Sequence, residues 1–157
     1  MTEVRLATVA DGDAIARLRR TWTEENAGQS IPDDTFESRF EEWFERERQQ
    51  RLTWLGFVDG IDDPVGMLNL LVFTRMPFPL APATERPRQW GYLANCFVRA
   101  EHRNTGLGGD LFDACTTHAD DLGFARIVLS PSDRSVSFYA RVGFAPATSL
   151  MVRQGPG

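Results

Sequence analysis

The chain contains no lysine, and all 17 of its basic side chains are arginines. The absence of lysine excludes a P-loop nucleotide-binding protein, because the lysine of that motif contacts the bound phosphates. It also excludes enzymes whose own lysine forms a Schiff base with a substrate or with pyridoxal phosphate. Two large classes of enzyme are thus removed before any motif is considered.

Cysteine and histidine are scarce, with two residues of each. Cys96 and Cys115 lack C-x-x-C spacing and fall inside predicted elements, which favours reduced thiols. The cysteines and histidines form no cluster with metal-ligand spacing, so we predict no metal site. Apolar runs fall far short of the ~20 residues of a membrane span, and residues 1–5 lack the pattern of a signal peptide. We therefore expect a cytoplasmic protein with no membrane partner.

The remaining composition is that of a folded globular protein. The chain has 157 residues, of which 42% are hydrophobic, and it shows no repeat or linker. This length suits one domain over residues 1–157. The net charge is −5, with an isoelectric point near 5.0, and this disfavours a nucleic-acid partner because phosphate contacts need a basic surface.

Hydrophobic periodicity predicts the element order βααβββαβαβ, which is a mixed α/β fold. The second helix is expected from Asp33 or Asp34 and the third from Asn104 or Thr105 to Leu122. A strand, a helix and another strand around the third helix imply a parallel pair. A proline-rich loop is expected at residues 77–87. The predicted strands are 4–9, 53–58, 65–74, 90–98, 126–129 and 147–153, and the other helices begin after Asp11 and span 135–142.

The stretch RNTGLGG, residues 103–109, joins a predicted strand to a predicted helix. Glycines let the backbone turn sharply and let a ligand approach closely. A helix N-terminus presents free N–H groups and the positive end of the helix dipole, which together bind phosphate, and Arg103 adds a positive charge beside them. A glycine-rich loop that only turns the chain explains this segment equally well.

Residues 98–108, VRAEHRNTGLG, resemble motif A of the GNAT superfamily of N-acetyltransferases, whose core is [RQ]-x-x-G-x-[GA]. Residues 137–144, SFYARVGF, resemble motif B of that family, with Tyr139 followed four residues later by Gly-Phe. The two motifs stand in the family's order with a predicted strand between them. The resemblance implies the GNAT fold: a mixed, mostly antiparallel sheet with a central splayed parallel pair, flanked by helices.

The resemblance also implies acetyl-coenzyme A as cosubstrate, lying between strands 90–98 and 126–129. The backbone of residues 96–98 is expected to pair with the pantetheine arm, and the N–H groups from Arg103 or Asn104 to Gly109 are expected to hold the pyrophosphate. The amide of Phe97 or Val98 is expected to polarise the acetyl carbonyl. The cofactor-binding residues predicted in this way are Cys96, Phe97, Val98, Arg103, Asn104, Thr105, Gly106, Leu107, Gly108, Gly109, Ser132, Ser135 and Tyr139.

Two residues are predicted to be catalytic by the same resemblance. The phenol of Tyr139 is expected to protonate the departing thiolate of coenzyme A, and Asn95 is expected to orient the amine or a water molecule. We interpret Cys96 as a small packing residue, which implies direct transfer without an acetyl-cysteine. The base is not identifiable. Glu24 and Glu25 are candidates that could act through water, but we favour their interpretation as ordinary surface carboxylates.

We therefore expect an N-acetyltransferase that acts by direct attack in a ternary complex. The expected acceptor is a small primary amine, an antibiotic-like amine, or a peptide N-terminus or lysine, and the acidic balance favours a cationic one. Two alternatives stay open, a non-catalytic coenzyme A-binding regulatory module and a transferase that uses another acyl-coenzyme A. A homodimer also stays open, because the apolar strands can form an interface.

Overall fold

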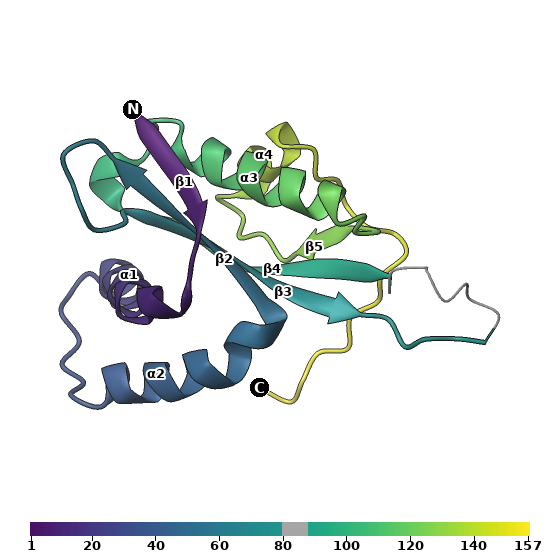
Figure 1. Ribbon diagram of the computed structural model, residues 1–157, viewed down its shortest axis with the longest axis horizontal. Helices are drawn as coiled ribbons and strands as arrows, with labels where there is room; N and C mark the ends of the chain where they lie inside the picture. The colour runs from purple at the N-terminus through teal and green to yellow at the C-terminus, as the bar shows by residue number, and fades with distance from the viewer. Residues whose placement is uncertain (80–87) are drawn as a thin grey trace.

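The computed structural model describes residues 1–79 and 88–157 of the chain. These residues form five strands and four α-helices, with short 3-10 turns between some of them (Figure 1). Most of the proline-rich loop predicted at residues 77–87 lies outside the described residues. The strands are β1 (Thr2–Leu6), β2 (Arg51–Val58), β3 (Gly66–Thr74), β4 (Gln89–Val98) and β5 (Ile127–Leu129), and the helices are α1 (Gly12–Ala27), α2 (Phe36–Glu47), α3 (Leu107–Asp121) and α4 (Val136–Arg141).

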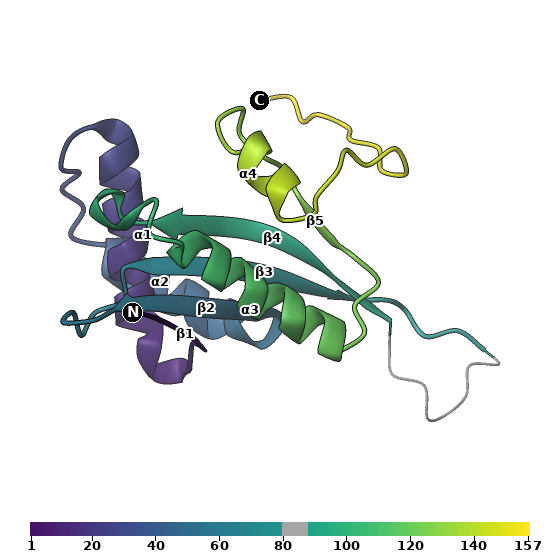
Figure 2. The ribbon, with the colours of Figure 1, turned by 90° about the horizontal axis from the view of Figure 1, so that it is seen from above.

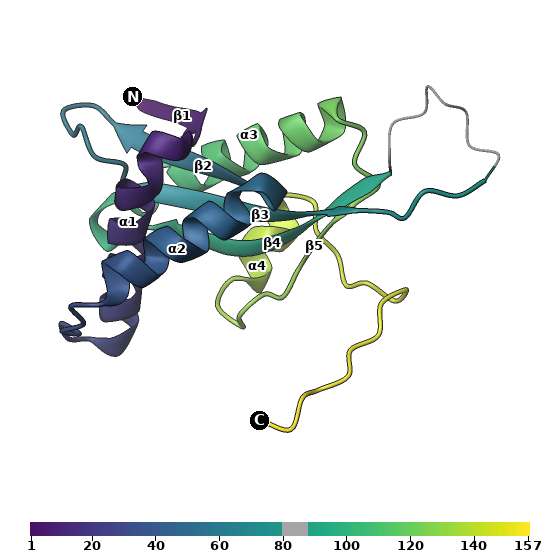
Figure 3. The same cartoon turned by 60° about the horizontal axis from the view of Figure 1, so that its bottom comes forward.

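The strands form one sheet in the order β1-β2-β3-β4-β5. The first four strands pair antiparallel, and β4 pairs parallel with β5. Helix α3 covers one face of the sheet, and α1 and α2 lie on the other (Figures 2 and 3). The predicted fold class, a mostly antiparallel mixed sheet with one parallel pair and flanking helices, is confirmed. No helix in the described residues is long and apolar enough to cross a bilayer.

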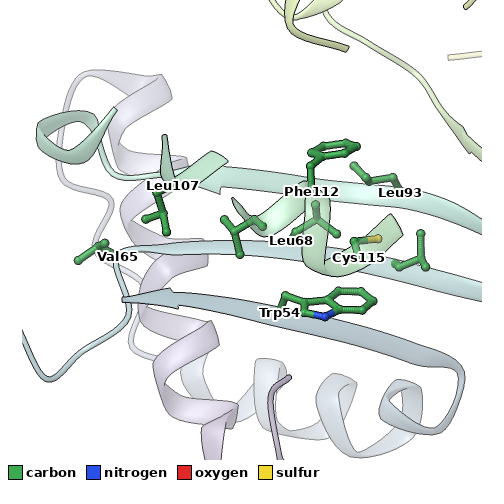
Figure 4. Close-up of a cluster of buried hydrophobic side chains, with 9 residues drawn as sticks. Trp54, Val65, Leu68, Leu93, Leu107, Phe112 and Cys115 are labelled. Atoms are coloured by element: carbon green, nitrogen blue, oxygen red, sulfur yellow. The ribbon is translucent and has the colours of Figure 1, made fainter. Parts of the chain in front are cut away.

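The larger core lies between the sheet and α3 (Figure 4). Alternate residues of β3 and single residues of β2 and β4 point into it, because successive side chains of a strand face opposite sides of the sheet. Helix α3 contributes side chains at helical spacing, so one face of the helix is buried. The buried members are Trp54, Val65, Leu68, Leu70, Leu93, Leu107, Leu111, Phe112 and Cys115.

The first residue of α3, Leu107, packs against Gly56 of the sheet. Leu107 is fully buried, and a Cβ atom built on Gly56 of β2 would lie 2.7 Å from its Cδ1 atom. The absence of a side chain at Gly56 therefore lets the start of α3 lie close against β2. This contact fixes the position of the glycine-rich turn that precedes Leu107.

We expect Gly56→Ala to lower the free energy of unfolding by about 1–3 kcal/mol, because overpacking a full core forces side chains or backbone to shift. Urea denaturation followed by circular dichroism measures the change. Gly155→Ala is the matched control, since a Cβ atom there has no neighbour within 4 Å. Equal stability of Gly56→Ala and wild type would contradict this account of the α3 contact.

A second core lies between the sheet and α1. Its buried members are Ile15, Leu18, Leu55, Met67 and Phe97. Trp22 of α1 stacks on Phe97 of β4, with ring centroids 5.5 Å apart. The face of β4 opposite α3 is therefore in direct contact with α1.

Two helices begin later than predicted. Helix α3 begins at Leu107 rather than at Asn104 or Thr105, because Asn104 (φ 62°) and Gly106 (φ 97°) have left-handed backbone conformations that a helix does not contain. Helix α2 begins at Phe36 rather than at Asp33 or Asp34. The Asp33 carboxylate accepts hydrogen bonds from the main-chain N–H and the hydroxyl of Thr35 (3.0 and 2.8 Å), which form a turn before the helix.

The first strand ends earlier than predicted, at Leu6 rather than at residue 9. Thr8 and Asp11 form a capping box, and this starts a 3-10 turn in place of more strand.

The predicted last strand, residues 147–153, is wrong. These residues adopt no strand, and Leu150, Met151 and Val152 are exposed. Figure 2 shows the chain after α4 running away from the sheet. An isolated extended segment has no partner for its backbone N–H and C=O groups, so an apolar composition alone does not make a strand.

Candidate active site

Strands β4 and β5 separate after a short paired stretch. Only Gly91, Tyr92 and Leu93 pair with β5, whereas β4 continues to Val98. On the other side of β4 the pairing with β3 shifts between Leu93 and Asn95, so Ala94 is an extra, bulged residue. Beyond β5 the chain rises toward α4, away from β4 (Figure 2). The sequence predicted that the two strands splay apart, and the structure places the opening at the bulge.

The register shows which main-chain groups face this opening. The N–H of Arg99 donates to the carbonyl of Val65 (2.9 Å), and Phe97 pairs with Met67. Antiparallel pairs alternate in hydrogen bonding, so the N–H and C=O of Phe97 face β3 while those of Cys96 and Val98 face the opening. Of the two amides predicted to polarise a carbonyl, only that of Val98 is therefore directed into the opening.

Arg103 does not provide a free positive charge beside the glycine-rich turn, as its position in the sequence had suggested. Its Nε atom donates to the carbonyl of Val98 (2.9 Å), and its Nη2 atom pairs with the carboxylate of Glu25. The side chain thus ties the loop after β4 to the strand and to the end of α1. It also occupies the Val98 carbonyl and leaves the N–H of that residue available.

The glycine-rich turn presents a row of unpaired N–H groups. Four of them, from Gly106 to Gly109, precede the first helical hydrogen bond of α3, in which Asp110 donates to Gly106 (3.1 Å). No side chain of residues 1–79 or 88–157 caps this helix start. Cβ atoms built on Gly106 and Gly109 have no neighbour within 4 Å. The turn is therefore open to a ligand, as a phosphate-binding helix start requires.

Tyr139 lies on α4 in an aromatic cluster with Phe112, Phe138 and Phe144. Phe112 comes from α3, so the cluster fixes α4 to the main core. Burial raises the pKa of the Tyr139 phenol to about 12, and the neighbouring Cys96 thiol adds to this rise. Tyr139 is therefore a protonated hydrogen-bond donor throughout the physiological pH range.

Ser132 and Ser135 form the turn that leads into α4. The N–H and hydroxyl of Ser135 both donate to the carbonyl of Ser132 (2.9 Å each), and the two hydroxyl oxygens lie 3.0 Å apart. The hydroxyl of Ser132 is exposed and that of Ser135 is partly covered. These side chains stabilise the start of α4 whether or not they contact a ligand.

Neither cysteine is an activated thiol. Burial raises the pKa of both Cys96 and Cys115 to about 12, so both carry a proton at neutral pH. A reactive cysteine has a lowered pKa. The environment of Cys96 is thus that of a packing residue.

The two candidate bases are engaged elsewhere. Glu25 pairs with Arg103, and Glu24 accepts a hydrogen bond from the N–H of Ile31 (3.0 Å). Neither residue lines the pocket between the sheet and helices α1 and α2. Their interactions are those of structural carboxylates at the end of α1.

A pocket of about 460 Å³ lies on the other face of β4, between the sheet and helices α1 and α2. The Asn95 side chain lines this pocket, while the main chain of the next residue, Cys96, faces the opening toward β5. The pocket and the opening between β4 and β5 therefore lie on either side of neighbouring residues of β4, next to the bulge. The lining residues are Ile15, Arg19, Phe36, Arg39, Phe40, Trp43, Met67, Asn69 and Asn95.

The two arginines of this pocket were not predicted as site residues. Helical spacing is the feature of the sequence that could have indicated them. Arg19 follows Ile15 by four residues, and Arg39 and Trp43 follow Phe36 by three and seven residues. The sequence predicted the helix that carries Arg39 but gave no sign that this arginine lines a pocket.

Comparison with known proteins gives one family and many similar structures. The family described as Acetyltransferase (GNAT) family matches residues 14–144. No curated protein matches the chain in sequence. A predicted acetyltransferase with acetyl-CoA from Clostridium acetobutylicum has a TM-score of 0.72 at 15% identity, over 98% of this chain and 96% of that one.

Two further structures carry named activities. Glucosamine-6-phosphate N-acetyltransferase from Arabidopsis thaliana has a TM-score of 0.70 at 12% identity, over 98% of each chain. Ribosomal-protein-alanine N-acetyltransferase from Brucella melitensis biovar Abortus 2308 has a TM-score of 0.69 at 18% identity, over 99% of this chain and all of that one. At these identities the likeness is one of fold.

Proposed function

The chain belongs to the acetyltransferase (GNAT) family, and we propose that it transfers the acetyl group of acetyl-coenzyme A directly to a primary amine within a ternary complex. One observation carries this proposal: the opening between β4 and β5 leads to an uncapped, glycine-lined helix start. On the other face of β4, a separate pocket offers room for an acceptor. An opening at one edge of β4 and a pocket on its face suit a reaction between two bound substrates.

The residues present fit coenzyme A. The free main-chain N–H and C=O groups of Cys96 match an extended, amide-containing arm that needs hydrogen-bond partners. The N–H groups of residues 106–109 and the dipole of α3 match a diphosphate. When bound, acetyl-coenzyme A supplies a thioester, which is an acyl donor with a good leaving group.

Three groups of this chain can assist the transfer. The N–H of Val98 donates a hydrogen bond to the acetyl carbonyl oxygen, where negative charge develops during attack. Asn95 orients the amine from the acceptor pocket. Tyr139 donates its phenolic proton to the departing sulfur. Because no carboxylate lines the acceptor pocket among the described residues, we propose that solvent takes the proton of the amine.

We expect Cys96→Ala to keep kcat within about twofold of wild type, because a thiol with a pKa of about 12 is protonated and a poor nucleophile. Initial rates measured at varied concentrations of both substrates should give intersecting lines, as a ternary complex does. Parallel lines, together with loss of turnover in Cys96→Ala, would instead indicate a covalent acetyl-cysteine.

The proposed function is tested by calorimetric titration with coenzyme A and by a thiol-release assay over a panel of amines. Binding of coenzyme A with release of free thiol supports the proposal. Binding without turnover of any amine would indicate a non-catalytic coenzyme A module. Faster turnover with propionyl- or succinyl-coenzyme A than with acetyl-coenzyme A would indicate that the acyl donor is that compound and not acetyl-coenzyme A. Absence of binding at millimolar coenzyme A would overturn the proposal.

A further inference from the structure

Resting on the proposed function, we infer that the acceptor is a primary amine that also carries a carboxylate and an apolar or aromatic body, as a hydrophobic amino acid does. The inference comes from the pocket between α1, α2 and the sheet. Its volume of about 460 Å³ lies within the range of small-molecule sites. Its walls differ in chemistry, and each part of such a ligand has a matching wall.

One wall of the pocket carries a positive charge that has no salt-bridge partner among the described residues. Arg19 lines the pocket, and no carboxylate in residues 1–79 and 88–157 forms a salt bridge with it, whereas its neighbours Arg17 and Arg20 pair with Asp63 and Glu37. The Arg19 guanidinium lies over the ring of Trp22, 4.9 Å from its centroid, and this contact orients it. Arg19 is an exposed residue, and a guanidinium without a counter-ion among the described residues favours a carboxylate ligand.

The second arginine contributes little net charge. Arg39 is neutralised by Asp33, and its Nε atom donates to the hydroxyl of Thr35 (3.2 Å). Arg19 is therefore the residue that sets the charge preference of the pocket.

No aspartate or glutamate of the described residues lines this pocket. A cationic acceptor such as a polyamine needs carboxylates to replace its hydration, and an unpaired arginine would repel it. The net charge of −5 had favoured a cationic acceptor through long-range steering. The charge inside the pocket has the opposite sign, and at contact distance the local charge outweighs the distant ones because water and salt screen the latter.

The apolar wall comes from α2. The rings of Phe36, Phe40 and Trp43 are neighbours along one face, with centroids 5.9 and 5.3 Å apart. Trp43 is held in place by the Arg51 guanidinium, which lies 5.0 Å from its ring centroid. Such a preformed aromatic surface suits a flat or branched apolar group.

The polar end of the pocket is the side chain of Asn95. Asn69 beside it already donates to Thr53 (2.7 Å) and accepts from Arg51 (2.9 Å). Asn95 makes no such bond to a side chain in the described part of the chain and is only half-buried. The amine therefore belongs next to Asn95 and the β4 bulge, with the carboxylate toward Arg19 and the apolar body along α2.

Matched pairs of amines test this inference. Phenylalanine and tryptophan should give a kcat/KM about tenfold or more above phenethylamine and tryptamine, which differ only by the missing carboxylate, as charge-assisted hydrogen bonds predict. Arg19→Gln should abolish this preference, by raising KM for the amino acids and not for the two decarboxylated amines. Arg17→Gln, on the same helix and outside the pocket, should keep the preference.

Binding of products gives a second readout that does not depend on turnover. N-acetylphenylalanine should raise the melting temperature of wild type with coenzyme A bound, and it should have little effect on Arg19→Gln. Preference for the decarboxylated amines or for spermidine would overturn the inference and leave the proposed function standing. Coenzyme A binding without turnover of any of these amines would also overturn the acceptor class, whereas loss of coenzyme A binding would overturn the proposed function itself.

Discussion

Replacing Tyr139 by phenylalanine should lower kcat about 10²- to 10⁴-fold, which is the range for loss of a general acid. The Kd for coenzyme A should change by no more than a few-fold. Only the hydroxyl is removed, so the ring contacts with Phe112 and Phe144 remain. Without the phenolic proton, the thiolate must leave without a partner. Steady-state kinetics and calorimetric titration measure the two quantities.

The chain has two tyrosines, and the second serves as the control. Tyr92→Phe removes an exposed hydroxyl from β4, and its kcat should stay close to that of wild type. If both variants lose the same activity, the effect is a general one on the strands. If Tyr139→Phe keeps full kcat, Tyr139 is a packing residue and another group protonates the sulfur.

The pKa of Tyr139 gives this prediction a pH dependence. Burial raises the pKa to about 12, above the value of about 10 in an unfolded chain. Below pH 10 the phenol is protonated in both states, so it produces no alkaline limb in kcat between pH 6 and 9. Above pH 10 the unfolded chain loses the proton first, so stability falls as the pH rises toward 12. Tyr139→Phe should lose less stability over that interval, measured by urea denaturation at pH 9 and 11.5.

The secondary structure of the two motif segments was predicted well. The glycine-rich turn lies between β4 and α3, where residues 103–109 indicated, and Tyr139 lies on the short helix α4 that follows β5. These signals are local, because glycine spacing and helical periodicity depend on neighbouring residues. The error in the start of α3 is also local: the positive φ of Asn104 is uncommon for a residue other than glycine, and sequence gives little warning of it.

The parts that depend on distant residues were not predicted. The ion pair between Arg103 and Glu25 joins residues 78 positions apart, so nothing in either segment indicates that the arginine is already occupied. The acceptor pocket likewise combines α1, α2, β3 and β4. Its character depends on which arginine has a carboxylate partner, and Arg19 and Arg39 look alike in the sequence. Such facts follow only from tertiary packing.

Exchange of Gly109 for aspartate should weaken coenzyme A binding about 100-fold without unfolding the protein. A carboxylate there would stand at the α3 start, where the diphosphate is proposed to bind. Like charges about 5 Å apart repel by about 3 kcal/mol at an effective dielectric constant of about 20, which is about 100-fold in Kd. The free protein should be at least as stable as wild type, because a Cβ atom at Gly109 meets nothing within 4 Å and an acidic residue in the first turn stabilises a helix by about 0.3–1 kcal/mol.

Opposite effects on stability and binding distinguish electrostatic repulsion from damage to the fold. Gly109→Asn is the control, since asparagine has nearly the same shape without the charge, and its Kd should stay within a few-fold of wild type. The difference between the two variants in Kd for coenzyme A should become smaller in 1 M salt, where the screening length falls to about 3 Å. If both variants weaken binding equally at low salt, the side chain acts by its size. If neither does, the diphosphate binds away from this helix start, and the proposed use of the β4–β5 opening falls with it.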